Sequence, residues 1–264
     1  MTRFASLASG SSGNSAVYIS EQTCILIDAG TNTKYIRNAL SGLGLSLGDL
    51  THVLVTHTHT DHISALPVLM KHTRAALLCT HTAAPALARC IPNRDVLRPF
   101  TEGDELGLGD VCVTGLATPH DSEGSCCYLI GDGAQRVAYC TDLGCMPRRL
   151  LGAMHGAPVV FLESNHDLRM LREGPYPYVL KKRILSERGH LSNVECAEAA
   201  VELARGGMKT LVLAHLSEEN NAPHVALAES ERQLAAAGFS AVSVTVAPRG
   251  ETLAPLMLGQ ECAV

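Results

Sequence analysis

Short apolar segments alternate along most of the chain with segments whose apolar residues recur at helical spacing. Runs rich in Val, Ile, Leu and Cys that end in turn residues are typical of β-strands. The predicted strands are residues 16–20, 24–30, 52–57, 75–80, 111–118, 126–132, 137–142, 159–164, 210–215 and 241–247. The predicted helices are residues 32–43, 64–72, 82–90, 193–206 and 223–237.

This alternation of strands and helices predicts an α/β fold. The last two helices carry apolar residues on one side, which favours their packing on the face of a sheet. The chain has 264 residues, 46% of them hydrophobic, and no Pro/Gly/Ser-rich linker or run of charge divides it. We therefore expect one domain over residues 1–264.

Composition indicates the cellular compartment of the protein and the partners that it can bind. The apolar runs are far shorter than the roughly 20 residues of a membrane span, and the first ten residues lack the apolar core of a signal peptide. We expect a soluble, cytoplasmic protein without membrane contact. The ten cysteines form no CxxC pair, so reduced core cysteines are expected. A net charge of −5 argues against broad, non-specific binding to nucleic acid, although a local basic or metal site can still bind a phosphodiester.

Six of the predicted strands end in, or lead into, a side chain that can bind a metal or transfer a proton. These side chains are Asp28, His57, His120, Asp142, Glu163 and His215. In α/β proteins, ligands bind beyond the carboxyl ends of the strands. The sequence therefore predicts a reactive site at one edge of the fold.

The segment "HTHTDH" at residues 57–62 places three histidines and an aspartate within six residues. His57 and His59 are two apart in extended chain, so they project to the same side and can bind one cation. Asp61 and His62 lie at the turn into a helix and can reach a second cation. A histidine-rich surface loop is the alternative, but the segment directly follows an apolar strand and other strands also end in His or Asp.

These motifs resemble those of the metallo-β-lactamase superfamily over the whole chain, with Asp28 in "LIDAG", His120 in "TPHD", Asp142 in "CTDLG" and His215 in "LAHLS" as the further matches. The resemblance implies a four-layer αββα sandwich with a dinuclear site at one edge. It places the first metal at His57, His59 and His120, the second at Asp61, His62 and His215, and Asp142 between them. The commonest zinc β-lactamases have a cysteine where Asp142 stands, which speaks against antibiotic hydrolysis.

Three further segments resemble the YycJ/WalJ (VicX) group: "SLASGSSGNSAVYI", the stretch from "FLESNHD" to "GHLSN", and "AHLSEENN". This group is regarded as 5′-to-3′ DNA exonucleases linked to mismatch repair. The resemblance implies DNA with a 5′-phosphorylated duplex end as substrate, and repair proteins as partners. His215 follows Asp142 too closely to leave room for the large cap domain of some related nucleases.

"GHLSN" also resembles a motif of the tRNA 3′-processing branch, in which a histidine donates a proton and a glutamate orients it. The matching residues here are His190 and Glu163. Capping of the helix that starts near Ser192 is the alternative for this segment.

Two cations at one edge can generate a hydroxide at neutral pH and stabilise both oxygens of a phosphodiester displacement. Asp61 can accept a proton from the water besides acting as a ligand, and Asp28 can support a ligand histidine from behind. Histidine and carboxylate ligands suit zinc, manganese or iron, and the ligands alone do not select among these metals.

Candidate substrate-binding residues lie in two places. Ser11, Ser12 and Asn14 belong to a glycine-rich loop whose amides can bind an anion, and Ser192 and Asn193 start a helix. A tight turn and simple helix capping are the respective alternatives.

The segment from Tyr176 to Arg183 combines the only aromatic cluster, "PYPY", with "LKKR". Phosphate contact or base stacking is one interpretation, and an exposed charged helix is the other. The sequence gives Asn165, His166 and Asp167 no role.

Three functions compete at this stage. The first is a metal-dependent phosphodiesterase that acts on DNA, which the pairing of His190 with Glu163 favours. The second is a small-molecule hydrolase of the same fold, acting on a thioester, lactone or cyclic nucleotide, which the acidic net charge favours. The third is a non-catalytic accessory protein, disfavoured because a structural metal site needs only four ligands.

Overall fold

The computed structural model describes residues 1–259, which fall into two compact units. Unit 1 contains Met1–Ala117, Ser122–Gln135 and the segment from Pro248 onward. Unit 2 contains Thr118–Asp121 and Arg136–Ala247. No helix within the described part of the chain is both long and apolar enough to cross a membrane.

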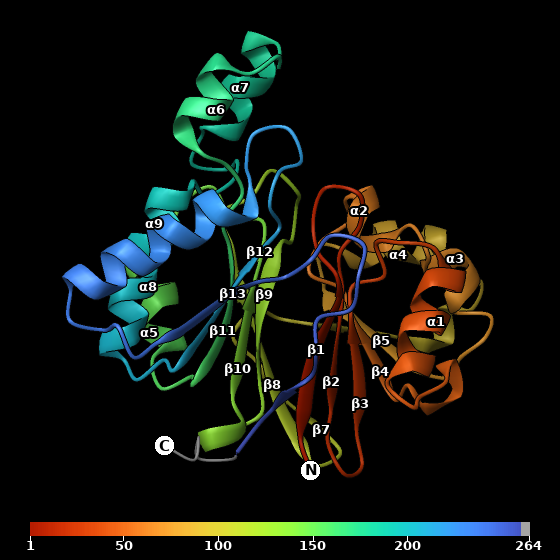
Figure 1. The fold of residues 1–264 in the computed structure, drawn as a ribbon. Coiled ribbons are helices and arrows are strands. Elements are labelled where there is room, and N and C mark those ends of the chain that lie inside the picture. The colour runs from red at the N-terminus through yellow and green to blue at the C-terminus, as the bar shows by residue number, and fades with distance from the viewer. Residues whose placement is uncertain (260–264) are drawn as a thin grey trace. The chain divides into compact units, whose positions relative to one another are not determined.

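Unit 1 is built on a mixed sheet with the strand order β14-β1-β2-β3-β4-β5-β6. Strand β1 is antiparallel to β14 and β2, and β2 is antiparallel to β3, whereas β3 to β6 are parallel. The helices of this unit lie beside the sheet in Figure 1. The strands are β1 (Arg3–Ala8), β2 (Ser15–Ile19), β3 (Cys24–Ile27), β4 (His52–Leu54), β5 (Ala76–Thr80), β6 (Leu97–Phe100) and β14 (Leu256–Met257), and the helices are α1 (Thr33–Gly42), α2 (Thr60–Ile63), α3 (Leu66–Leu69) and α4 (Ala84–Cys90).

The same unit holds the antiparallel strands β7 (Glu105–Leu108), β8 (Val111–Ala117) and β9 (Cys126–Ile130). Its core is a continuous apolar cluster in which Leu26 of β3 and Val53 of β4 are fully buried between strand and helix neighbours. Parallel strands that are buried in this way read as unbroken apolar runs, which is why they are recognisable in the sequence.

Unit 2 contains four parallel strands, β10 (Val137–Cys140), β11 (Val159–Glu163), β12 (Thr210–Ala214) and β13 (Ser243–Val246). Helices α5 (Arg148–Met154), α8 (Asn193–Arg205) and α9 (Pro223–Ala236) lie along these strands, and α6 (Leu168–Glu173) and α7 (Tyr178–Ile184) lie beyond the strand ends (Figure 1). Helix α8 begins at a capping box formed by Ser192 and Glu195, and it buries Cys196, Ala200 and Leu203 at helical spacing.

Each of the ten predicted strands overlaps an observed strand, and four of the five predicted helices match observed helices closely. The helix predicted over 64–72 is only the single turn α3. The predictions missed the strands β1, β6, β7 and β14 and the helices α2, α5, α6 and α7. Strand β1 has the sequence RFASLA and is almost entirely buried. Its alanines and serine are not typical of strands, so the sequence did not indicate one there.

Candidate metal centre

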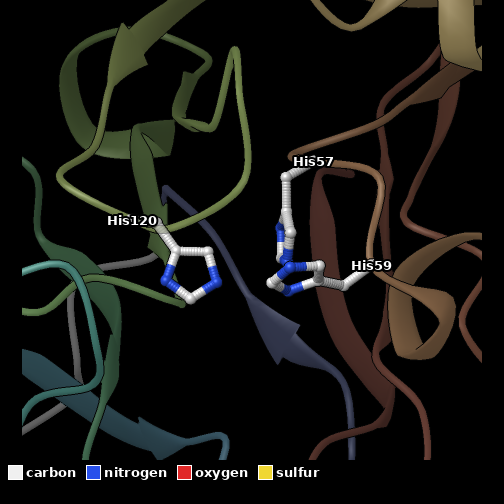
Figure 2. A group of neighbouring side chains, drawn as sticks. All are labelled: His57, His59 and His120. Carbon is white, nitrogen blue, oxygen red and sulfur yellow. The ribbon is translucent and has the colours of Figure 1, made fainter. Parts of the chain in front are cut away.

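The histidine segment of unit 1 follows β4 and continues into the short helix α2. Figure 2 shows the His57 and His59 side chains on this segment, and their rings lie edge to face with centroids 4.7 Å apart. The ring of His62 lies 4.0 Å from that of His57. His57 and His62 are fully buried, so this segment brings imidazole nitrogens together in a nearly water-free environment.

Asp28, the residue after β3, fixes the orientation of His62. Its Oδ2 lies 2.7 Å from Nδ1 of His62, and both carboxylate oxygens accept hydrogen bonds from Thr56, from the backbone N–H and the hydroxyl, each at 2.8 Å. A histidine that donates through Nδ1 to a carboxylate presents the lone pair of Nε2 as its ligand atom. The hydroxyl of Thr56 also lies 3.1 Å from Nδ1 of His57. The sequence does not identify Thr56 as a site residue, because a threonine at a strand end is common.

Asn14 holds the glycine-rich loop against the histidine segment. It is fully buried, its side-chain amide lies 3.0 Å from Nε2 of His62, and its backbone N–H donates to the Asp61 carbonyl at 2.8 Å. Gly30 is required beside it, because a Cβ on Gly30 would lie 1.6 Å from the Asp61 carbonyl oxygen. These contacts give Asn14 a positioning role.

Unit 2 contributes a second group of side chains whose chemistry would suit a metal. Asp142 and Glu163 lie at the carboxyl ends of the neighbouring parallel strands β10 and β11, and His215 follows β12. Together with His190 they form a cluster whose ligand atoms all lie within 4.8 Å of one another. Parallel strands end at the same edge, which explains why residues far apart in sequence meet here.

Glu163 organises this cluster. Its Oε1 lies 2.8 Å from Nδ1 of His190 and 2.8 Å from Nδ1 of His215, and its Oε2 accepts the backbone N–H groups of Leu143 and Leu191. Burial acts to raise the pKa of Glu163, but the charge of His190 and these hydrogen bonds outweigh burial and lower it. The carboxylate therefore stays ionised and fixes both rings by their Nδ1 atoms.

His190 is the histidine of this group with the most solvent contact, with its side chain 17% exposed. Burial acts to lower the pKa of His190, but the charge of Glu163 and the hydrogen bond to it raise the pKa above its ordinary value. Asp142 acts in the same direction, with Oδ1 at 3.6 Å from Nδ1 of His190. These contacts therefore favour the protonated imidazolium of His190 more than an ordinary histidine environment does.

His120 lies on the segment that follows β8 (Figure 2). Its Nδ1 donates to the carbonyl of Gly189 at 3.1 Å, and its own carbonyl accepts the Arg188 side chain at 2.9 Å. Burial lowers the pKa of His120, so its neutral form, which can bind a metal, is favoured. The same Nδ1 pattern as in His62 and His215 leaves Nε2 as its ligand atom.

Both donor sets suit a divalent metal. They combine neutral imidazoles with carboxylate oxygens, the ligand chemistry of zinc, manganese and iron. Burying several carboxylates and imidazoles beside one another is costly unless a cation compensates the charge. The residues of these sets are His57, His59, Asp61 and His62 in unit 1, and His120, Asp142 and His215 in unit 2.

Backbone strain marks three of the site residues. Asp28, Asp142 and His215 have φ values of 57°, 59° and 55°, and they are the residues other than glycine with positive φ within residues 1–259. The left-handed conformation costs a residue with a Cβ about 1 kcal/mol, and such positions concentrate at functional sites. In each case a strand ends and the chain turns so that the side chain enters the site.

The candidate substrate-binding residues separate into two groups. Ser11 and Ser12 are exposed, and Ser12 lines a cavity of about 390 Å³ in unit 1. Ser192 and Asn193 are buried, and their side chains hydrogen-bond within the protein, to Glu195 and to Ser164 and Asn221 respectively. Because these side chains bond within the protein, Ser192 and Asn193 are not among the proposed substrate contacts.

The structure gives roles to two of the residues that the sequence left unassigned. The side-chain amide of Asn165 donates to the His215 carbonyl at 3.0 Å and supports that ligand. Asp167 caps the start of α6 by accepting two backbone N–H groups. His166 is buried, and neither ring nitrogen has a hydrogen-bond partner within the described chain.

Residues 8–215 match the sequence profile of the Metallo-beta-lactamase superfamily. The chain belongs to this superfamily. It is 34% identical over 238 residues to the exodeoxyribonuclease YycJ of Bacillus anthracis, a match that covers 89% of this chain and 90% of YycJ. The exodeoxyribonuclease WalJ of Streptococcus pneumoniae is 33% identical over 239 residues and covers 89% of both chains. The predicted membership in the YycJ/WalJ group is confirmed.

Solved structures show the same fold. The metallo-β-lactamase fold protein YhfI from Bacillus subtilis superimposes with a TM-score of 0.74 at 17% identity and covers 96% of this chain and 98% of YhfI. A diphosphatase from the PhnP family gives a TM-score of 0.67 at 17% identity and covers 98% of each chain. The predicted fold, the αββα sandwich of the superfamily, is confirmed. Family membership and the two donor sets identify the protein as a metal-dependent hydrolase.

Proposed function

We propose that this protein is a metal-dependent DNA exonuclease that degrades a strand from its 5′ end. The observation that carries the proposal is the pair of His190 and Glu163 beside Asp142 and His215, in a chain that is one-third identical to two exodeoxyribonucleases over nine-tenths of its length. A phosphodiester leaves an alkoxide, which needs a proton, and His190 is the residue placed to supply it.

We propose two divalent metals, zinc or manganese, with iron as a further possibility. The resemblance to the superfamily assigns His57, His59 and His120 to the first metal and Asp61, His62 and His215 to the second, with Asp142 between them. When bound, such a pair supplies a hydroxide at neutral pH and stabilises the attacking and leaving oxygens. Seven ligands exceed what one tetrahedral ion uses, which supports two ions.

The chain's own groups then transfer the protons. Asp61, whose side chain is 25% exposed, takes the proton of the attacking water. His190 donates a proton from Nε2 to the departing 3′-oxygen, because Glu163 holds Nδ1 and raises the pKa of the ring. Asp28 and Glu163 prevent rotation of the His62 and His215 rings during turnover.

We assign the terminal 5′-phosphate to the cavity of about 390 Å³ in unit 1. Ser12 provides a hydroxyl donor there, and Arg249 provides the positive charge that favours a phosphate. Helix α1, ten residues long, begins at this cavity with Asn32 as its N-cap, and the positive end of its dipole favours an anion. Ser11 lies on the same loop and remains a candidate contact.

A small-molecule hydrolase is the second candidate. The volume of the cavity lies within the usual range of small-ligand sites, and the net charge of −5 gives no general attraction to DNA. A thioester, lactone or cyclic nucleotide is the expected substrate class in that case.

End-labelled DNA separates these functions. The metal-loaded protein is incubated with a duplex that carries or lacks a 5′-phosphate, with closed circular duplex, with RNA of the same sequence and with a model thioester. We expect stepwise release of mononucleotides from the 5′-phosphorylated end. Equal cleavage of closed circles, or turnover of the thioester alone, would refute the proposal. The resemblance also implies mismatch repair, which the mutation frequency of a strain without the gene would test.

A further inference from the structure

Helix α7 exposes large apolar side chains that a folded protein normally buries. Tyr178 and Val179 are 78% and 79% exposed, and Leu185, directly after the helix, is 45% exposed. They make up half of the large apolar residues that are exposed within residues 1–259. Figure 1 shows α6 and α7 beyond the strand ends, apart from α5, α8 and α9. A cluster of this kind on one short helix indicates a binding surface.

The charge of this region is opposite to that of the chain. Residues 167–188 contain six basic and three acidic residues, a net charge of +3, whereas the whole chain carries −5. Lys182 and Arg183 are both exposed on α7. The surface is therefore complementary to a polyanion.

Internal contacts already account for two of the three basic side chains on α7. Lys181 donates to the carbonyls of Arg172 and Gly174, each at 2.8 Å, and thereby joins α7 to the end of α6. Arg183 lies 2.5 Å from Asp121, the residue after His120. These contacts hold α7 in a fixed orientation and leave Lys182 to contact a ligand.

The carboxyl end of α7 is joined to the acid of the proposed mechanism. The backbone N–H of His190 donates to the carbonyl of Ile184, the last residue of α7, at 3.0 Å. A seven-residue helix is about 10 Å long, so Tyr178 lies about that far from this end. Tyr178 and Lys182 are four residues apart and share one face of the helix.

We infer that the α7 face, defined as Tyr178, Val179 and Lys182, binds a single DNA strand beside the reaction site. Tyr178 stacks on an unpaired base, Val179 extends the apolar contact, and Lys182 contacts a backbone phosphate. An aromatic side chain next to a cation is the arrangement by which proteins hold single strands without sequence preference. The inference rests on the proposed nuclease function and adds the surface that holds the substrate strand.

Four variants test the α7 face. Tyr178→Ala and Lys182→Ala remove the proposed contacts, and Tyr178→Phe keeps the ring without the hydroxyl. Lys209→Ala removes an equally exposed lysine at the amino end of β12, the opposite end of the strand from His215. All three positions are on the surface, and thermal unfolding of each variant shows that it is folded.

Binding is measured with a labelled single strand whose phosphorothioate linkages resist cleavage, and turnover with ordinary DNA and with bis(p-nitrophenyl) phosphate. We expect Tyr178→Ala to weaken binding by about tenfold and Tyr178→Phe to bind like the parent. Lys182→Ala lowers the slope of log Kd against log salt by about 1, and Lys209→Ala leaves it unchanged. Hydrolysis of bis(p-nitrophenyl) phosphate stays at the parent rate in all four variants.

Failure of this inference and failure of the proposed function give different results. A parent protein that hydrolyses bis(p-nitrophenyl) phosphate but neither binds nor degrades DNA shows that the nuclease function is wrong. A parent that degrades DNA, with Tyr178→Ala and Lys182→Ala equal to it, shows that the α7 face is not the strand-binding surface. The inference is also overturned if Tyr178→Ala and Lys182→Ala weaken the binding of RNA but not of DNA. A change in their oligomeric state without a change in DNA binding has the same meaning.

Discussion

Nδ1 of His190 lies 2.8 Å from Oε1 of Glu163, a carboxylate that is completely buried. The pair combines a histidine whose side chain is partly exposed with a carboxylate that solvent cannot reach. Because Glu163 holds Nδ1, the only ring nitrogen of His190 that can deliver a proton to a substrate is Nε2. This relationship separates the proposed proton donor from the proposed metal ligands and makes the two roles testable.

We predict that His190→Ala lowers DNA turnover by about 10²- to 10⁴-fold while the metal content stays that of the parent. The departing 3′-oxygen then lacks its proton, whereas the ligands are intact. A substrate with a p-nitrophenolate leaving group needs no proton and should be hydrolysed at close to the parent rate. Turnover of both substrates and metal content by elemental analysis check this. Equal losses on both substrates would mean that His190 is structural, and loss of metal would mean that it is a ligand.

We predict two divalent metals per chain after reconstitution, and fewer in His59→Ala. The histidine loses a ligand atom from the first metal, so metal content and turnover fall together. His81→Ala is the control, because His81 is exposed and lies outside both donor sets. Elemental analysis of gently purified and reconstituted protein measures the stoichiometry. A maximum of one metal per chain in the parent would be incompatible with the dinuclear site.

We predict that Arg249→Ala raises the KM for DNA with a 5′-phosphate by roughly tenfold or more, since a hydrogen bond to a charged group contributes about 1.5–3 kcal/mol. The KM for the same DNA with a 5′-hydroxyl should be unaffected, because no terminal phosphate enters the cavity. Arg37→Ala, an exposed arginine of α1, serves as the control. Steady-state kinetics with the 5′-phosphate and the 5′-hydroxyl substrates measure this difference in KM. An equal effect of Arg249→Ala on both substrates would mean that the terminal phosphate binds elsewhere.

We predict that His166 makes the protein less stable in acid. Burial lowers the pKa of His166 to about 4. Between about pH 6.5 and pH 4, His166 therefore binds a proton in the unfolded chain but not in the folded chain. The free energy of unfolding falls as the pH falls through this window. The loss is about 3 kcal/mol at most. In His166→Gln this part of the pH dependence disappears.

Denaturant unfolding of both proteins with a chelator present, so that metal release does not contribute, measures this difference. The free energy of unfolding of His166→Gln should fall less than that of the parent between pH 6.5 and pH 4. Parallel curves for the two proteins would show that His166 is protonated without cost in the folded state.

The strands and the residues that end them could be predicted because buried parallel strands leave a simple signal. An apolar run that ends in a polar residue, as at Asp28, Glu163 and His215, stands out against its surroundings. The link between Glu163 and His215 could not be predicted, because the two residues are 52 positions apart and meet only when β11 and β12 pair.

The short helices and the loop contacts could not be predicted from the sequence either. Helices α6 and α7 have six and seven residues, too few for a helical pattern to be distinguished from a charged loop. The buried position of Asn14 depends on Gly30 and Asp61, which approach it from other parts of the chain. Such tertiary contacts decide whether a polar residue meets the substrate or the protein, and local sequence does not record them.

The positive φ angles at Asp28, Asp142 and His215 have a consequence for the protein's evolution. Glycine adopts this conformation without steric cost, so the backbone conformation taken by itself would favour glycine at all three positions. Retaining carboxylate and imidazole side chains there runs against that tendency. An ancestral or laboratory lineage released from its catalytic task should therefore drift toward glycine at these positions first, and such glycines in a homologue would identify a member of the fold that has abandoned hydrolysis.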